Sequence, residues 1–235
     1  MPSAMPALPY RKEKVFDNGA TCCYAAAAAG VDEATAAELL SRLPPDEQET
    51  YRRYRQPGSR EMFLCSRSIL REELARRGLP HDAKIAFGEH QKPFLERYPE
   101  RHFNVSHSAG AVMVGFSERP LGVDIERMVS LRGEQLVAIA GRVFHEAEVA
   151  LLLRQPVEAE RRRLFTKLWT LKESIVKALG VGFYADTKAI EVPDVEHARQ
   201  GEVQVGASRL RFHADAYTGA CGEAYLTAVA YIAAP

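Results

Sequence analysis

The sequence places a block of short strand-like segments between two blocks of helical patterns, and this order restricts the fold more than any other feature. Apolar residues recur every three or four positions in the helical blocks. Helices are predicted over residues 32–43, 46–55, 59–77, 133–143, 146–153 and 161–179. Strands are predicted over 21–27, 84–87, 103–105, 112–116, 121–126, 189–192, 202–205, 209–213 and 224–232. Strands and helices that come in separate runs, without a regular βαβ alternation, predict an α+β fold.

The middle of the chain offers a natural division. Residues 117–120 read Ser-Glu-Arg-Pro, a sequence typical of a turn, and predict a hairpin between the strands on either side. A division there gives an N-terminal half, 1–117, and a C-terminal half, 118–235, of similar length. Residues 1–19 are expected to form a loose leader ahead of the first strand.

Charge and cysteine content exclude several classes of protein. The 31 Lys and Arg residues balance 31 Asp and Glu residues, so the surplus of positive charge typical of nucleic-acid binders and of proteins held on anionic lipid is missing. No stretch approaches the roughly 18 apolar residues of a membrane span. The four cysteines, Cys22, Cys23, Cys65 and Cys221, form no C-x-x-C pair, which favours reduced thiols in a cytoplasmic protein.

Two acidic residues share one face of the strand predicted over 121–126. The sequence there is Gly122-Val-Asp-Ile-Glu126, and side chains alternate along a strand, so Asp124 and Glu126 point the same way. Two neighbouring carboxylates repel each other unless a cation lies between them. A hard cation such as Mg²⁺ prefers oxygen ligands. The residues alone leave two interpretations open, a metal site and a solvated acidic face.

A second cluster lies on the helix predicted over 161–179. Trp169, Glu173 and Lys177 are spaced four residues apart and share a helix face. Glu173 could supply a third carboxylate and Lys177 a phosphate contact, with Trp169 fixing the helix against the sheet. The alternative is an ordinary exposed Glu–Lys pair, which contributes about 0.3–0.5 kcal/mol.

A polar run, Asn104-Val-Ser-His-Ser108, follows the strand predicted over 103–105. In a turn, Ser106 and His107 could bind a phosphate. They could also form a nucleophile pair, but adjacent residues place a base poorly for its nucleophile, and no G-x-S-x-G elbow is present. Lys92, before Pro93, and Arg67, on the preceding helix, are further candidate phosphate contacts. For each of these residues solvent exposure is the alternative.

The order of these motifs resembles one enzyme family. A Lys-Pro loop, then F-N-V-S-H-S, then G-V-D-I-E, then W-T-L-K-E-S-I-V-K is similar to the 4′-phosphopantetheinyl transferases of the longer, surfactin-type branch. The resemblance is dense from residue 92 to residue 180 and looser over 45–74. It implies a pseudo-dimer of two similar α/β halves with coenzyme A in the cleft between them. The implied reaction moves phosphopantetheine from coenzyme A to a serine hydroxyl of an apo acyl or peptidyl carrier protein and releases adenosine 3′,5′-bisphosphate.

The resemblance also implies roles for individual residues. Asp124, Glu126 and Glu173 would hold Mg²⁺ on the pyrophosphate, and Lys177 would contact that pyrophosphate. Glu173 is also the candidate base for the serine hydroxyl. Coenzyme A would be bound by Asp124, Glu173 and Lys177 together with the phosphate contacts, which are Lys92, Ser106, His107 and Arg67.

The sequence departs from the family pattern at two places. Gln91 precedes Lys92 where the family usually has glycine, which puts the approach of the backbone to the ligand in question. Glu47 and Thr50 replace an upstream basic pair, so Arg52 or Arg53 could serve the adenine end of the site.

The expected partners follow from the resemblance. Carrier proteins of this kind are acidic, so Arg127, Arg132 and Arg142, beyond the acidic strand, are candidate docking residues. We expect a monomeric, cytoplasmic enzyme without nucleic-acid or membrane partners. Two alternatives remain: a Mg²⁺-dependent transferase for another pyrophosphate-containing donor, and a silent relative that binds coenzyme A or a carrier protein without turnover.

Overall fold

A computed structural model describes residues 12–16, 20–26, 31–182, 186–219 and 222–233. Six α-helices are described: α1 (Glu33–Arg42), α2 (Pro45–Arg53), α3 (Pro57–Arg76), α4 (Gly133–Val143), α5 (Glu146–Arg154) and α6 (Glu158–Leu179). The described strands are β1 (Lys12–Val15), β2 (Thr21–Ala26), β3 (Ile85–Phe87), β4 (Pro93–Leu95), β5 (His102–Ser108), β6 (Ala111–Ser117), β7 (Leu121–Arg127), β8 (Gln200–Val205), β9 (Ser208–Thr218) and β10 (Ala224–Ile232). The predicted α+β class is confirmed.

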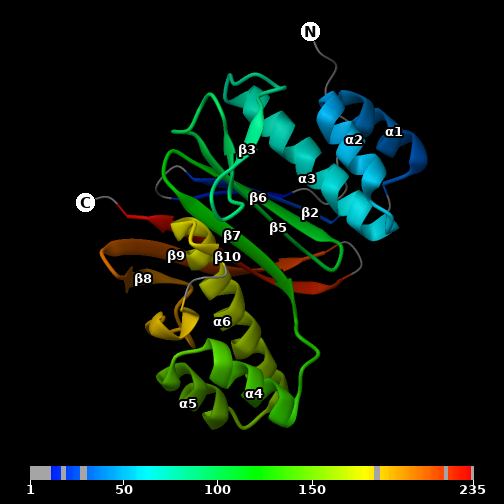
Figure 1. Cartoon of the computed structure of the whole chain (residues 1–235). Coiled ribbons are helices and arrows are strands. Elements are labelled where there is room, and N and C mark those ends of the chain that lie inside the picture. The colour runs from blue at the N-terminus through cyan, green and yellow to red at the C-terminus, as the bar shows by residue number, and fades with distance from the viewer. Residues whose placement is uncertain (1–11, 17–19, 27–30, 183–185, 220–221, 234–235) are drawn as a thin grey trace.

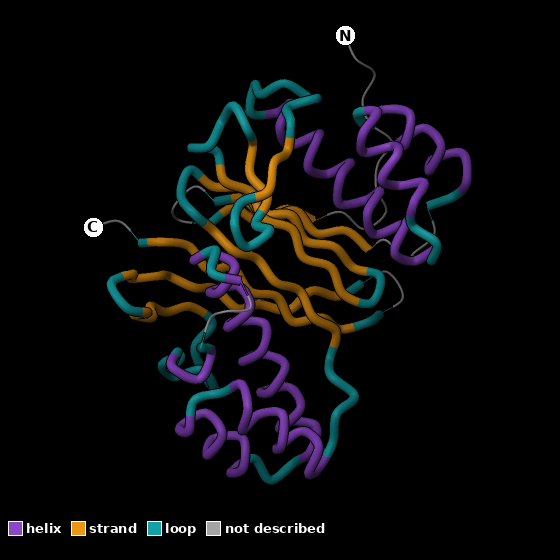
Figure 2. Tube along the Cα trace, in the orientation of Figure 1, coloured by secondary structure: helices purple, strands orange, loops and turns teal. Residues whose placement is uncertain are grey.

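The strands form a central layer with helices on two sides (Figures 1 and 2). One sheet has the order β1-β2-β6-β5 and the other β7-β10-β9-β8, while β3 and β4 form a separate two-stranded hairpin. Helix α3 packs against the first sheet and α6 against the second, while α1 and α2 pack on α3 and α4 and α5 pack on α6. None of the helices in the described ranges combines the length and the apolar character that a membrane span requires.

Alternation along the strands divides the apolar residues among three cores. On β6, Val112, Val114 and Phe116 pack toward α3, whereas Met113 points into a core between the two sheets. On β10, Ala228 and Ala230 face the helices of the second half, and Val229 and Tyr231 face the core between the sheets. Both strands are therefore covered on two faces, which explains their nearly continuous apolar sequence.

The predicted hairpin at 117–120 is wrong. Strand β6 pairs with β5 and β2, whereas β7 pairs antiparallel with β10. In this pair Asp124 of β7 lies opposite Ala228 of β10. The segment after Ser117 is thus a crossover from one sheet to the other. A local turn sequence cannot reveal that β7 pairs with a strand about one hundred residues further along the chain.

The boundaries of several elements also differ from those predicted. Lys12–Val15 forms strand β1 inside the expected leader, of which residues 1–11 and 17–19 lie outside the described ranges. Pro93–Leu95 forms β4 within an expected loop. The predicted strand over 189–192 is wrong: Thr187–Ala189 forms a short 3₁₀ helix, and the Val192 N–H donates to Glu148 Oε1 rather than to another strand.

The division into halves 1–117 and 118–235 stays a prediction. All strands of the first four-stranded sheet precede it and all strands of the second follow it.

Gly122 explains how α6 lies directly on β7. A Cβ atom at this position would collide with the backbone of Ser174 and Ala178 and would stand 2.7 Å from Lys177 Cβ. The glycine of the G-V-D-I-E motif therefore permits the close approach that brings the acidic strand beside the helix that carries Glu173.

We expect Gly122→Ala to lower the free energy of unfolding by about 3 kcal/mol, because backbone atoms of α6 would have to shift. Urea denaturation measures this value. Gly141→Ala is the matched control: an added Cβ on this α4 glycine meets nothing within 4 Å, so it should raise stability by about 0.5–1 kcal/mol. Equal effects of the two substitutions would contradict the close-approach explanation.

Candidate functional site

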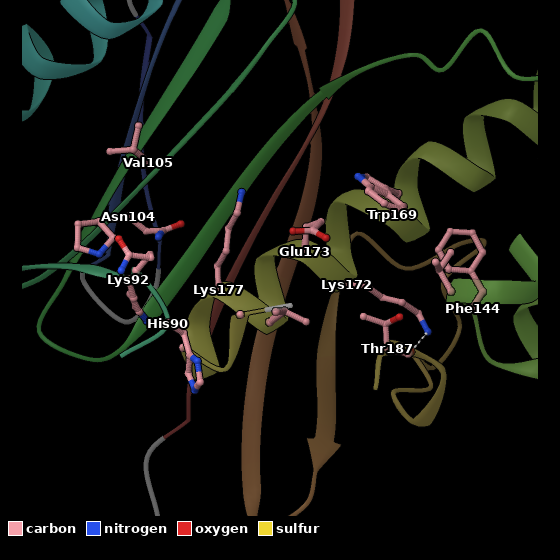
Figure 3. A pocket seen from close by; sticks show the side chains of 16 residues that line it. His90, Lys92, Asn104, Val105, Phe144, Trp169, Lys172, Glu173, Lys177 and Thr187 are labelled. Carbon is pink, nitrogen blue, oxygen red and sulfur yellow. Dashed lines mark hydrogen bonds between the residues drawn. The ribbon is translucent and has the colours of Figure 1, made fainter. Parts of the chain in front are cut away.

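A cavity of about 470 Å³ lies where the β3–β4 hairpin, β5, α6 and the end of α4 meet. Figure 3 shows Lys92, Asn104 and Val105 on one side, and Trp169, Glu173 and Lys177 in succession along α6 on the other. The walls therefore come from segments far apart in the sequence.

Side chains of β5 join the two sheets next to this cavity. The Val123 N–H donates to Asn104 Oδ1 at 2.9 Å, the Ile125 N–H to Ser106 Oγ at 3.4 Å, and the Arg127 N–H to Ser108 Oγ at 3.3 Å. Each step of two residues on β5 matches a step of two on β7, so these strands run side by side in the same direction. We call these three bonds the seam.

Asp124 is the buried centre of the site. It is 3% exposed. Its Oδ1 accepts from Ser106 Oγ at 2.7 Å and from Lys177 Nζ at 2.6 Å. Its Oδ2 is buried, and among the described residues no hydrogen-bond partner reaches it. A buried carboxylate oxygen without a partner is costly, so this oxygen indicates a place for a ligand.

Glu126 and Glu173 complete the acidic group. Burial raises the pKa of both carboxyl groups, and the charge of Asp124 raises them further, whereas Lys177 lowers them. Glu126 Oε2 also accepts from Ser108 Oγ at 2.6 Å, which lowers the pKa of Glu126. The three carboxylates, two on β7 and one on α6, thus act on one another electrostatically.

The carboxylates do not form a finished metal site. Across the described ranges, no group of three or more His, Cys, Asp or Glu side chains is arranged to hold a metal ion. Lys177 Nζ, bonded to Asp124 Oδ1, supplies the positive charge nearest to the aspartate.

Lys92 connects the hairpin to α6. Its Nζ donates to the carbonyl oxygen of Ala178 at 2.9 Å, in the last turn of the helix. Burial lowers the pKa of Lys92 to about 8. The negative end of the helix dipole favours a cation here, but the ammonium group is still poorly solvated, and an anion in the cavity would stabilise its charged form.

The residue before Lys92 has a left-handed backbone. Gln91 has φ of 60°. Glycine adopts this conformation freely, whereas other residues pay about 1–2 kcal/mol for it. The structure therefore gives a backbone reason for the glycine that the family usually has at this position.

Two other predicted phosphate contacts, Ser106 and His107, do not lie in a turn as expected. Ser106 and His107 belong to strand β5 rather than to a turn, so their side chains point to opposite faces. Ser106 is buried, with its hydroxyl bonded to Asp124, Ile125 and Lys177, whereas His107 is exposed. This arrangement rules out a Ser106–His107 nucleophile pair.

Arg67 lies in the helical layer of the first half. Its Nε is 3.5 Å from Glu47 Oε1, and its guanidinium lies 5.4 Å from the centre of the Phe63 ring. Burial lowers the pKa of Arg67. Glu47, the departure from the family pattern, also forms a two-bond ion pair with Arg71. Of the residues suggested for the adenine end, Arg53 is exposed and pairs with Glu49 on α2.

Several residues that line the cavity were missed or interpreted differently. Trp169, expected to fix α6 against the sheet, stacks on Phe165 at the edge of the core and lines the cavity. Lys172 Nζ lies 2.7 Å from Glu148 Oε2 and donates to the Thr187 carbonyl oxygen, which holds the cavity wall around Thr187 in place. Glu148 Oε2 also accepts the N–H of His145, the residue that caps α5, but its contacts with Lys172 and Val192 join segments that lie far apart in the sequence.

Comparison with known proteins agrees with this geometry. The family model of the 4′-phosphopantetheinyl transferase superfamily matches residues 120–230. The 4′-phosphopantetheinyl transferase Sfp of Bacillus subtilis (strain 168) is 31% identical over 146 residues, which are 61% of this chain and 63% of that protein. Over these residues the chain is similar to the members of this superfamily.

Two further members show similar matches. The 4′-phosphopantetheinyl transferase gsp of Aneurinibacillus migulanus is 32% identical over 149 residues, 62% of this chain and 60% of that protein. The 4′-phosphopantetheinyl transferase HetI of Nostoc sp. (strain PCC 7120) is 32% identical over 161 residues, 66% of each protein. The matches with these three transferases thus span between 60% and 66% of the relatives' own length.

Gln91→Gly should raise the free energy of unfolding by about 0.5–1 kcal/mol, because relief of the left-handed strain exceeds the extra entropy of glycine in the unfolded chain. Thermal and urea unfolding measure the change. The control is Gln135→Gly on the exposed face of α4, where the same change should cost about 1 kcal/mol. A loss of stability in both variants would contradict the strain at Gln91.

Proposed function

We propose that this chain is a 4′-phosphopantetheinyl transferase that acts as a holo-acyl-carrier-protein synthase. It transfers 4′-phosphopantetheine from coenzyme A to a serine hydroxyl of an apo acyl or peptidyl carrier protein. The similarity to the superfamily and the names of the relatives support this reaction. The observation that carries the proposal is the buried Asp124, with one unpartnered oxygen, beside a cavity that holds Glu173, Lys177 and Lys92.

The acidic group has the chemistry that Mg²⁺ requires. Asp124 Oδ2 is buried and has no hydrogen-bond partner among the described residues. Burial and the acidic neighbours raise the pKa values of Glu126 and Glu173, and a nearby cation would lower these pKa values again. Asp124, Glu126 and Glu173 would hold the ion. Bound there, Mg²⁺ would neutralise negative charge on the pyrophosphate of coenzyme A.

The basic residues of the cavity bind the anionic donor. Lys177 contacts the pyrophosphate, and Lys92 contacts the 3′-phosphate. His107 is exposed on β5 outside the lining of the cavity, so its 3′-phosphate contact stays a prediction. Each lysine is a point charge in a partly buried setting, where its interaction with a phosphate is stronger than in water. The predicted coenzyme A contacts of Ser106 and Arg67 stay predictions, since Asp124 and Glu47 already engage these side chains.

Glu173 serves as the general base. The serine oxygen of the carrier attacks the phosphorus that bears the pantetheine, and the bond to the bridging oxygen of the pyrophosphate breaks. Adenosine 3′,5′-bisphosphate leaves with that oxygen, and Glu173 takes the hydroxyl proton. Glu173 lines the cavity beside Lys177, where it can accept a proton from a hydroxyl group that enters the cavity.

The partner surface is expected beside the acidic strand. Arg127, Arg132 and Arg142 are exposed near β7 and α4, where they can attract an acidic carrier protein despite the zero net charge. We propose a monomeric cytoplasmic enzyme with no nucleic-acid or membrane partner.

Intact-protein mass spectrometry of an apo carrier protein tests the function. Incubation with the enzyme, coenzyme A and Mg²⁺ should add one phosphopantetheine, and a chelator should prevent it. Asp124→Asn and Glu173→Gln should each slow transfer at least about 100-fold, because they remove a metal ligand and the base. Glu160→Gln, exposed in the first turn of α6, is the matched control. Absence of any mass gain with carriers of several pathways, despite coenzyme A binding, would favour a silent relative.

Coenzyme A affinity should fall as the pH rises through about 8. The charged form of Lys92 binds the anion, and its pKa of about 8 means that the protonated fraction drops about tenfold between pH 7 and pH 9. Calorimetry should therefore show up to about tenfold weaker binding at pH 9, and Lys92→Gln should abolish this dependence. Lys84→Gln removes an exposed lysine just before the same hairpin and should leave the pH profile unchanged. An identical pH profile in Lys92→Gln and the wild type would contradict the contact.

A further inference from the structure

Two serines of the seam, Ser106 and Ser108, make the same pair of hydrogen bonds to β7. Ser106 Oγ accepts the Ile125 N–H and donates to the Asp124 carboxylate. Ser108 Oγ accepts the Arg127 N–H and donates to the Glu126 carboxylate at 2.6 Å. In both cases the hydroxyl donates to an acidic side chain of β7 and accepts the backbone N–H of the next residue along the strand.

This repeated arrangement orients the hydroxyl groups. A serine hydroxyl has one hydrogen and two acceptor lone pairs. The backbone N–H of β7 takes a lone pair, and the hydroxyl hydrogen is then directed to the neighbouring carboxylate. The hydroxyl thus fixes one oxygen of the acidic side chain, Oδ1 of Asp124 and Oε2 of Glu126.

The consequence concerns the remaining oxygens. With Oδ1 held by Ser106 and by Lys177, the rotamer of Asp124 is set, and Oδ2 is the buried oxygen that no donor of the described residues reaches. We propose that Ser106 and Ser108 are positioning residues that set Asp124 and Glu126 for binding a divalent cation. This inference rests on the metal site of the proposed function.

Asn104 provides an internal comparison. It makes the same seam bond, accepting the Val123 N–H at 2.9 Å, but Val123 is apolar and follows Gly122, so no carboxylate stands at the matching position. A purely structural role of the seam would make Asn104 equivalent to the serines, whereas a positioning role distinguishes them.

The experiment is a titration of the free enzyme with Mn²⁺ alone, with the unbound ion followed by electron paramagnetic resonance. Ser108→Ala should weaken Mn²⁺ binding about tenfold, the scale expected when an outer-shell partner of a metal ligand is lost. Ser108→Thr keeps the hydroxyl and should restore the affinity. Asn104→Ala should lower the unfolding midpoint but leave the Mn²⁺ affinity within twofold of the wild type.

The outcomes separate this inference from the proposed function. Tight binding by the wild type that is lost in Asp124→Asn but unchanged in Ser108→Ala would overturn the positioning role and leave the metal site intact. An equal loss in Asn104→Ala and Ser108→Ala would also overturn it, since the seam would then act only on the fold. Equal uptake by the wild type and Asp124→Asn would overturn the metal assignment itself, and this inference with it. Ser106→Ala extends the test to Asp124. Because Ser108 is partly exposed, the Ser108→Ala result does not depend on folding defects that a substitution of the buried Ser106 could cause.

Discussion

The seam between β5 and β7 is the interaction on which the arrangement of the site depends. Two sheets that do not share a backbone ladder are joined by side-chain acceptors at every second residue of β5. Buried backbone N–H groups must find partners, and here Asn104, Ser106 and Ser108 provide them. The strand that carries Asp124 and Glu126 is therefore placed against the first sheet by the same residues that hold those carboxylates.

The helix that carries Glu173 and Lys177 is placed by a second constraint, the absence of a side chain at Gly122. Because α6 can approach β7 so closely, Lys177 reaches Asp124 at 2.6 Å. At the end of the same helix, Lys92 from the β3–β4 hairpin bonds to the Ala178 carbonyl oxygen. The cavity is thus enclosed by contacts between early and late parts of the chain.

Buried ion pairs support the helices on both sides of the sheets. Glu47 and Arg71 join α2 to α3 in the first half, and Glu148 and Lys172 join α5 to α6 in the second. Loss of one partner from such a pair leaves an uncompensated buried charge, which makes each pair a determinant of the local geometry. Lys172 of the W-T-L-K-E motif therefore stabilises the wall of the cavity through Glu148 and the Thr187 carbonyl oxygen.

The sequence by itself determined which residues are chemically available and which elements carry them. Helical spacing placed Trp169, Glu173 and Lys177 on one face of α6, and strand alternation placed Asp124 with Glu126, because both periods follow from local backbone geometry. The order of the motifs also indicated the family to which the comparisons find similarity. Only the tertiary structure decided that β7 pairs with β10 and that Ser106 and His107 face opposite ways within a strand. It also decided that one buried oxygen of Asp124 finds no hydrogen-bond partner among the described residues. These features depend on contacts between residues that are distant in the chain, and a local sequence pattern cannot predict the free energies of such contacts.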